Sequence, residues 1–161
     1  MKEPEILRVI YNRFQGYFKF NKIVIGGSYY FASIGCQAPA EFKDLDLIVD
    51  EDPKNDKLLY DIKDFLNAEY ELKYEFIGRF EDKKLVATLS VKDQIDIDLL
   101  RNDLSDNLPQ IEIFPGIKSF QQSPKKLIEV YSNLKILAEK YSPDKIEKYN
   151  QIIKFYESKR K

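Results

Sequence analysis

The chain has 161 residues, with 26 basic and 27 acidic side chains, so its net charge is −1 at pH 7. This length predicts a single domain over residues 1–161, and the near-zero charge excludes a global attraction to nucleic acid or to an anionic membrane. Histidine is absent, and cysteine occurs once, at Cys36. These counts exclude Ser-His-Asp and Cys-His catalysis and histidine-rich zinc sites, so a bound metal needs oxygen ligands.

The compartment follows from the same composition. A single cysteine cannot form an internal disulfide, which fits a reducing environment. The first residues, Met1 to Pro4, lack the basic-then-apolar pattern of a signal peptide. No apolar run approaches the ~20 residues of a membrane span. We therefore expect a cytoplasmic protein with no membrane partner.

In chain order, the first elements combine a helix with a short buried strand. Residues 4–18 carry apolar side chains at helical spacing, which predicts an amphipathic helix. Residues 23–25 form a short apolar run that stops at two glycines, and this pattern predicts a buried strand entering a tight turn. Ser28 is a suitable N-cap for a helix over residues 29–35.

The middle of the chain predicts strands and one helix. Residues 44–50 alternate aspartates with apolar side chains, which is typical of a strand with its acids on one face. Residues 54–68 have the apolar spacing of a helix. Three strand-like runs joined by short turns follow, and this arrangement predicts antiparallel pairing; they span residues 71–79, 83–91 and 94–100.

The last part of the chain is mostly helical. A short strand is expected at 110–114, and Ser-Pro motifs begin helices that run to about residues 141 and 158. The predicted fold class is α/β (α+β): a mixed, partly antiparallel sheet of about five strands flanked by helices. Its core would span residues 21–100, and its C-terminal helical part residues 120–158.

Two short pieces of sequence indicate a binding site. Gly26 and Gly27 permit positive φ and close backbone approach, and the amides that follow, with the Ser28 hydroxyl, can cradle phosphate. Asp44 and Asp46 point to the same side of their strand, roughly 7 Å apart. Two such carboxylates repel each other unless a cation lies between them or water solvates them. Taken singly, each piece also fits a plain turn or a solvated strand face.

A second acidic strand strengthens the pattern. Asp96 and Asp98 alternate with apolar residues on a later run. Acids on two separate strands can converge on one metal site if those strands are neighbours. One acidic strand alone is easily an ordinary solvated strand. Two acidic strands that both follow a glycine turn are less easily explained in that way.

These three pieces resemble the signature of the DNA-polymerase-β-like nucleotidyltransferase superfamily, in a small, stand-alone member of the bacterial or phage type. The pieces are Gly26-Gly27-Ser28, Asp44-Leu45-Asp46 and Ile95-Asp96-Ile97, and the resemblance covers about residues 21–100 plus two trailing helices. The 15 residues from 29 to 43 are a longer spacer than the family pattern. Asp96 is preferred as the third acid because that acid usually sits between apolar residues in mid-strand; Asp98 is the alternative.

The resemblance implies a nucleotidyltransferase fold and a metal-dependent enzyme. Such an enzyme moves a nucleoside monophosphate from a nucleoside triphosphate to a hydroxyl acceptor and releases pyrophosphate. Asp44, Asp46 and Asp96 would hold two Mg²⁺ or Mn²⁺ ions and carry the catalysis, with Asp96 also assisting deprotonation. The nucleotide-binding residues implied are Gly26, Gly27, Ser28 and, next to the first acid, Lys43.

Several alternatives stay open from the sequence. The acceptor can be a small molecule, a protein or an RNA end, and neither the base of the triphosphate nor the oligomeric state follows from one chain. The small size and the long spacer also fit a catalytically weak or inactive nucleotide-binding module of a toxin–antitoxin or defence system. A structural domain whose acids face water by chance is the third hypothesis.

Overall fold

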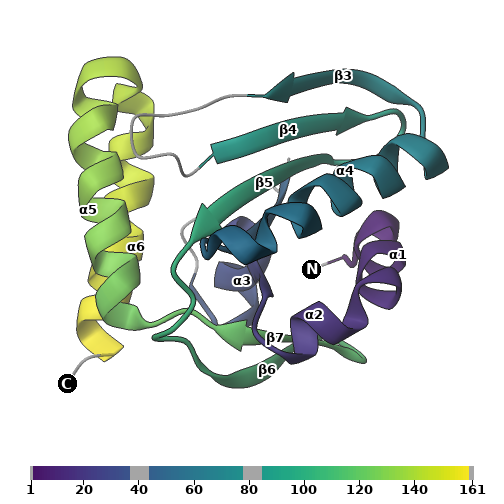
Figure 1. Ribbon diagram of the computed structural model, residues 1–161. Coiled ribbons are helices and arrows are strands. Elements are labelled where there is room, and N and C mark those ends of the chain that lie inside the picture. The colour runs from purple at the N-terminus through teal and green to yellow at the C-terminus, as the bar shows by residue number, and fades with distance from the viewer. Residues whose placement is uncertain (1, 37–43, 78–84, 160–161) are drawn as a thin grey trace.

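The computed structural model describes residues 2–36, 44–77 and 85–159, and its centre is a five-stranded sheet in the order β1-β2-β5-β4-β3 (Figure 1). The strands are β1 (Ile23–Gly26), β2 (Asp44–Asp50), β3 (Leu72–Ile77), β4 (Leu85–Val91) and β5 (Asp96–Asn102). β2 and β5 are parallel, whereas the other three neighbouring pairs are antiparallel. The predicted mixed sheet of five strands is confirmed, as is the antiparallel pairing of its last three strands.

The first predicted helix is divided in two. α1 (Glu5–Arg13) and α2 (Gln15–Lys19) are separated at Phe14, where φ is −114° and ψ is 25°. The apolar spacing continues across this break because Phe14 and Phe18 are both buried, so periodicity alone could not reveal it. α4 (Asp56–Glu69) follows a single 3₁₀ turn over Pro53–Asn55. No helix in the described ranges is both long enough and apolar enough to cross a membrane.

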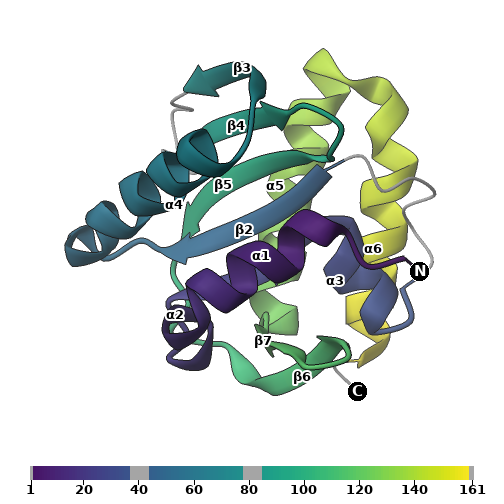
Figure 2. The ribbon, with the colours of Figure 1, turned by 90° about the vertical axis from the view of Figure 1, so that its right-hand side faces the viewer.

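Helices lie on both sides of the sheet. α1 and α4 cover one face, and α5 (Pro124–Tyr141) and α6 (Ile146–Lys159) lie on the opposite side (Figures 1 and 2). Leu45, Leu47 and Val49 of β2 are fully buried in the main core with apolar residues of α1 and α4. Because side chains alternate along a strand, the even-numbered positions of β2 face the other way. The two C-terminal helices are confirmed.

A second sheet, of two strands, lies below the five-stranded sheet in the view of Figure 1. β6 (Leu108–Phe114) and β7 (Ile117–Gln121) pair antiparallel across a turn at Gly116, whose φ is +78°. The sequence predicted a short strand at 110–114 but missed β7. The buried backbone N–H of Ile25 donates a hydrogen bond of 2.9 Å to Ser119 Oγ, which ties this hairpin to β1. The strand that leads into the glycine turn is therefore held by β2 and by the hairpin.

Candidate metal and nucleotide site

Four aspartates lie on one face of β2 and β5. The parallel register pairs Asp44 with Asp96 and Asp46 with Asp98. On both strands the intervening apolar side chains are buried in the main core, so the aspartates face away from α1 and α4. Burial of the apolar half of each strand thus determines where the acids point.

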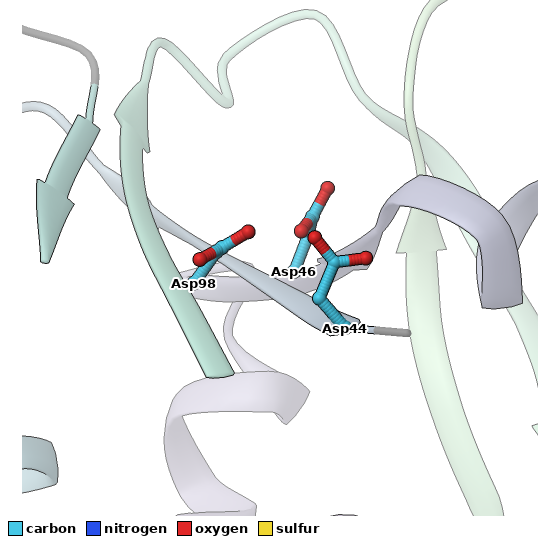
Figure 3. Close-up of side chains that lie close together, drawn as sticks. All are labelled: Asp44, Asp46 and Asp98. Carbon is cyan, nitrogen blue, oxygen red and sulfur yellow. The ribbon is translucent and has the colours of Figure 1, made fainter. Parts of the chain in front are cut away.

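Three of the four carboxylates form one compact group. Asp44, Asp46 and Asp98 each place a carboxylate oxygen so that all these atoms lie within 4.8 Å of one another. Figure 3 shows the three carboxylates gathered on the same side of the two strands. All three residues are partly buried rather than fully exposed. Acids more than 50 residues apart in sequence therefore meet, as the two-strand pattern predicted.

The third member of this group is Asp98 and not Asp96, which the sequence favoured. The criterion was an acid between two apolar residues in mid-strand, and Asp98, between the fully buried Ile97 and Leu99, meets it. β5 begins only at Asp96, so Ile95 lies before the strand. The sequence had placed the start of this strand at residue 94, which moved the apparent middle of the strand toward Asp96.

Thr88 on β4 holds the Asp98 carboxylate from the neighbouring strand. The two residues face each other in the antiparallel register, and the Thr88 hydroxyl donates a hydrogen bond of 2.7 Å to Asp98 Oδ1. Sequence analysis did not identify Thr88. The only available signal was the hairpin around the Lys92-Asp93 turn, and its register has an irregularity between Leu85 and Ala87 that sequence does not reveal.

The acids of this group carry an unfavourable charge arrangement. Burial raises the pKa of Asp46 to about 8, and repulsion from Asp44 and Asp98 acts in the same direction. Burial also raises the pKa of Asp98 to about 6, although the Thr88 hydrogen bond lowers it. Lys148 on α6 is the cation that lowers the pKa of Asp46. One lysine does not offset three carboxylates, so a bound cation would relieve the repulsion.

The glycine turn lies directly against the acids. β1 pairs with β2 so that Gly26 is opposite Asp46. Gly27 has a φ of +68°, and a Cβ atom at this position would lie 2.5 Å from Asp46 Oδ2. Both the left-handed backbone and the missing space therefore require glycine here. The glycine turn and the Asp46 carboxylate therefore lie directly against each other.

The remaining predicted site residues have different outcomes. α3 (Gly27–Ser33) begins at Gly27, with Gly26 as its N-cap and no side-chain cap, so the expected capping by Ser28 is wrong. Ser28 is instead a buried residue of the first turn. Lys43 lies outside the described residues.

Aromatic rings of the C-terminal helices and of α3 pack together beside the acids. The Tyr131 ring on α5 lies 5.4 Å from Phe31 of α3 and 5.6 Å from Tyr149 of α6, measured between ring centroids. Burial raises the pKa of Tyr131, and the negative charge of Asp46 raises it further. Sequence analysis assigned no site role to Tyr131, Tyr149 or Lys148, because only the packing of α5 and α6 brings them to the acids.

The donor set suits a hard divalent cation. All three side chains of the group offer carboxylate oxygens, which are the ligands that Mg²⁺, Mn²⁺ and Ca²⁺ prefer in proteins. Burial, together with repulsion among the aspartates, raises the pKa values of Asp46 and Asp98, and a bound cation would oppose both effects. The acidic group is therefore compatible with divalent metal binding.

The fold is of the nucleotidyltransferase type, and a solved structure supports this. The crystal structure of the Megavirus polyadenylate synthase is similar to this chain with a TM-score of 0.50 and 14% sequence identity. The similarity covers 99% of this chain and 35% of that chain, so the chain spans about a third of the length of the synthase. No protein-family model matches the chain, and no curated protein matches it in sequence.

Proposed function

We propose that this protein is a metal-dependent nucleotidyltransferase that moves a nucleoside monophosphate from a nucleoside triphosphate to a hydroxyl acceptor and releases pyrophosphate. The observation that carries the proposal is the group of Asp44, Asp46 and Asp98, with Gly27 against the Asp46 carboxylate. A nucleotidyltransferase-type fold around this group adds support.

The three aspartates would hold two Mg²⁺ or Mn²⁺ ions. Bound divalent cations supply charge neutralisation for the triphosphate and lower the pKa of an attacking hydroxyl. Asp44 and Asp46, two residues apart on one strand, are suited to share the ions. Asp98 is the proposed third ligand in place of Asp96, and the Thr88 hydroxyl donates a hydrogen bond to its Oδ1 atom.

The glycine turn would hold the leaving group. The backbone around Gly26 and Gly27 and the first turn of α3 at Ser28 are the proposed contacts for the β- and γ-phosphates, because free amides at a turn and a helix start bind anions. Lys43 is a further proposed phosphate contact. Such a cradle is preorganised to receive the charge that develops on departing pyrophosphate.

The proposed transfer is a displacement at the α-phosphorus. The acceptor hydroxyl oxygen forms a bond to that phosphorus, and the bond from phosphorus to the oxygen bridging the β-phosphate breaks. The electron pair of the broken bond leaves on pyrophosphate, and the hydroxyl proton passes to a carboxylate, for which Asp98 is the proposed acceptor. Little covalent chemistry is required of the protein, which suits a chain without histidine.

An assay that needs no knowledge of the acceptor tests the first half of this proposal. Manganese together with a nucleoside triphosphate should raise the melting temperature of the wild-type protein, because a ligand that binds the native state stabilises it. Asp46→Asn should lose this rise, whereas Asp64→Asn, on the exposed side of α4, should keep it. An unchanged melting temperature with all four triphosphates would contradict the proposal.

A transfer assay tests the second half. Triphosphates labelled at the α-phosphate are incubated with the protein, manganese, and small-molecule, protein or RNA acceptors. We expect label on one acceptor class and an equal amount of pyrophosphate. Asp46→Asn should reduce both by about 100-fold or more, since it removes charge stabilisation at the reacting centre. Binding of triphosphate without any transfer would instead favour a regulatory nucleotide-binding module.

A further inference from the structure

Gln122 is a nearly buried polar residue between the second sheet and the C-terminal helices. β7 ends at Gln121 and Ser123 is the N-cap of α5, so Gln122 is the one residue between the strand and the cap (Figure 1). It is only 8% exposed. Glutamine is rarely buried to this extent, and a buried amide usually has a hydrogen-bond partner. The surroundings of this side chain therefore require an explanation.

The backbone on both sides of Gln122 is fixed. The 2.9 Å hydrogen bond from Ile25 N–H to Ser119 Oγ joins β7 to the strand before the glycine turn. α5 begins directly after Gln122 with a side-chain cap from Ser123. Burial raises the pKa of Tyr30 on α3, and a backbone hydrogen bond from Gln122 acts in the opposite direction. Gln122 is thus held in place by β1, α3 and the start of α5.

The side-chain amide of Gln122 lies against the glycine turn. A Cβ atom at Gly26 would lie 3.2 Å from Gln122 Nε2 and 2.7 Å from Ile48 Cδ1. Gly26 is opposite Asp46 in the β1–β2 pair, and Ile48 is on the same side of β2 as Asp46. The amide and the Asp46 carboxylate therefore lie on the same face of the sheet, beside the two successive glycines of the turn.

This amide has no partner within the described part of the chain. None of the hydrogen bonds among the described residues uses Gln122 Nε2 or Oε1. Among the same residues, the completely buried side-chain polar atoms without a partner belong to Asp56 and Tyr156. Both amide atoms of Gln122 therefore keep some access to solvent, and a ligand can meet them without breaking a side-chain hydrogen bond of the protein.

We propose that the Gln122 side-chain amide donates a hydrogen bond to the triphosphate of the nucleotide, at its β- or γ-phosphate. This role rests on the proposed function, which puts these phosphates at the glycine turn. A glutamine amide offers two N–H donors and carries no charge. A lysine or arginine here would be attracted to Asp46 and would repel the metal ions. The neutral donor binds phosphate and leaves the acids free for metal.

Isothermal titration calorimetry tests this role. The ligands are Mn²⁺ alone, and Mn²⁺ with the nucleoside triphosphate that most raises the wild-type melting temperature, in a form that cannot be cleaved between its α- and β-phosphates. Gln122→Met keeps the length of the side chain and removes its donors. Triphosphate binding should weaken by about tenfold to a hundredfold, because a hydrogen bond to a charged group is lost. Binding of the corresponding monophosphate and of Mn²⁺ alone should not change.

Two further variants sharpen the comparison. Gln122→Glu replaces the donors with a carboxylate that repels phosphate, so it should bind the triphosphate more weakly than Gln122→Met does. It should bind Mn²⁺ alone at least as tightly as wild type. The matched control is Gln121→Met, because the Gln121 amide donates an exposed hydrogen bond of 3.0 Å to the carbonyl oxygen of Pro109. This control should bind the triphosphate as wild type does.

Melting temperatures without ligand separate this role from a structural one. Gln122→Met breaks no side-chain hydrogen bond within the described part of the protein, so its melting temperature should equal or exceed that of wild type. A residue that only supports the fold would lose stability and affinity together. A lower melting temperature with equal losses of affinity for Mn²⁺ alone and for the triphosphate would therefore overturn the proposed contact.

Two other results would also overturn it, and they bear differently on the transferase proposal. Triphosphate affinity of Gln122→Met equal to that of wild type would remove the contact and leave the proposed function intact. If the wild-type protein binds no triphosphate, the contact and the proposed function both fail.

Discussion

Gly27 is the residue at which the glycine turn and the acids meet. Gly27→Ala forces a left-handed alanine and moves the Asp46 carboxylate, since the new Cβ would lie 2.5 Å from Oδ2. We expect a loss of about 1–3 kcal/mol in the free energy of unfolding, and loss of manganese-dependent stabilisation. Urea denaturation and thermal melts with and without manganese measure the two effects.

Gly16→Ala is the matched control for that substitution. Gly16 lies within α2, and a Cβ there meets no other atom within 4 Å. Alanine is favoured over glycine within a helix, so this variant should keep or slightly raise the stability. Equal losses in the two variants would contradict a special role for Gly27.

Thr88 is the residue that orients the third carboxylate. Thr88→Val removes the 2.7 Å hydrogen bond to Asp98 Oδ1 and keeps the shape of the side chain. Loss of such an outer contact to a metal ligand commonly costs tenfold or more in affinity. We expect Mn²⁺ binding, followed by electron paramagnetic resonance, to weaken by about tenfold. Thr88→Ser should restore it, and a Val variant that binds as tightly as wild type would refute this role.

At the scale of elements, α3 depends on the C-terminal helices. This helix has only seven residues, and its Phe31 ring contacts Tyr131 of α5 and Tyr156 of α6. A helix this short is not stable alone, so the aromatic contacts hold the helix that follows Gly27. The position of the glycine turn is thus a property of packing between distant elements.

Phe31→Ala tests this dependence. Phe31 is 1% exposed, and truncation of a buried phenylalanine costs about 3–5 kcal/mol. Chemical denaturation should show a loss of that size, and manganese binding should weaken because the turn before α3 is no longer held. Phe20→Ala, at a ring that is 70% exposed, should change stability by less than about 0.5 kcal/mol. Similar losses in the free energy of unfolding of both variants would show that burial of the ring does not determine the loss.

At the scale of the whole molecule, the acidic group makes stability depend on pH. The folded protein raises the pKa of Asp46 to about 8 from an ordinary value of 3.8. Between these values the native state binds more protons than the unfolded state, so the free energy of unfolding falls as pH rises. The metal-free protein should lose stability from about pH 4 to about pH 8, by on the order of a few kcal/mol.

Melting temperatures across this range, measured in EDTA, check the prediction. Asp46→Asn should flatten the curve and melt at a higher temperature than wild type at pH 8, because the buried charge is gone. Manganese should stabilise the wild-type protein more at pH 8 than at pH 5, since cations compete with protons for the same carboxylates. A metal-free protein that is more stable at pH 8 than at pH 5 would be incompatible with the buried acid.

The sequence by itself determined much of this protein. The alternation of acids with apolar residues, the double glycine and the Ser-Pro helix starts act locally, so they predicted strands β1, β2 and β5, the glycine turn and both C-terminal helices. The absence of histidine and the single cysteine limited any metal site to oxygen ligands.

Only the tertiary structure decided which acid completes the group. Asp96 and Asp98 are alike in their local sequence pattern. The register of β5 with β2 brings Asp98 to Asp44 and Asp46. Its register with β4 places Thr88 opposite Asp98. β7 and the aromatic contacts of α3 with α5 and α6 likewise arise between elements distant in sequence. Register and packing depend on the sum of many long-range contacts, and no local pattern in the chain encodes that sum.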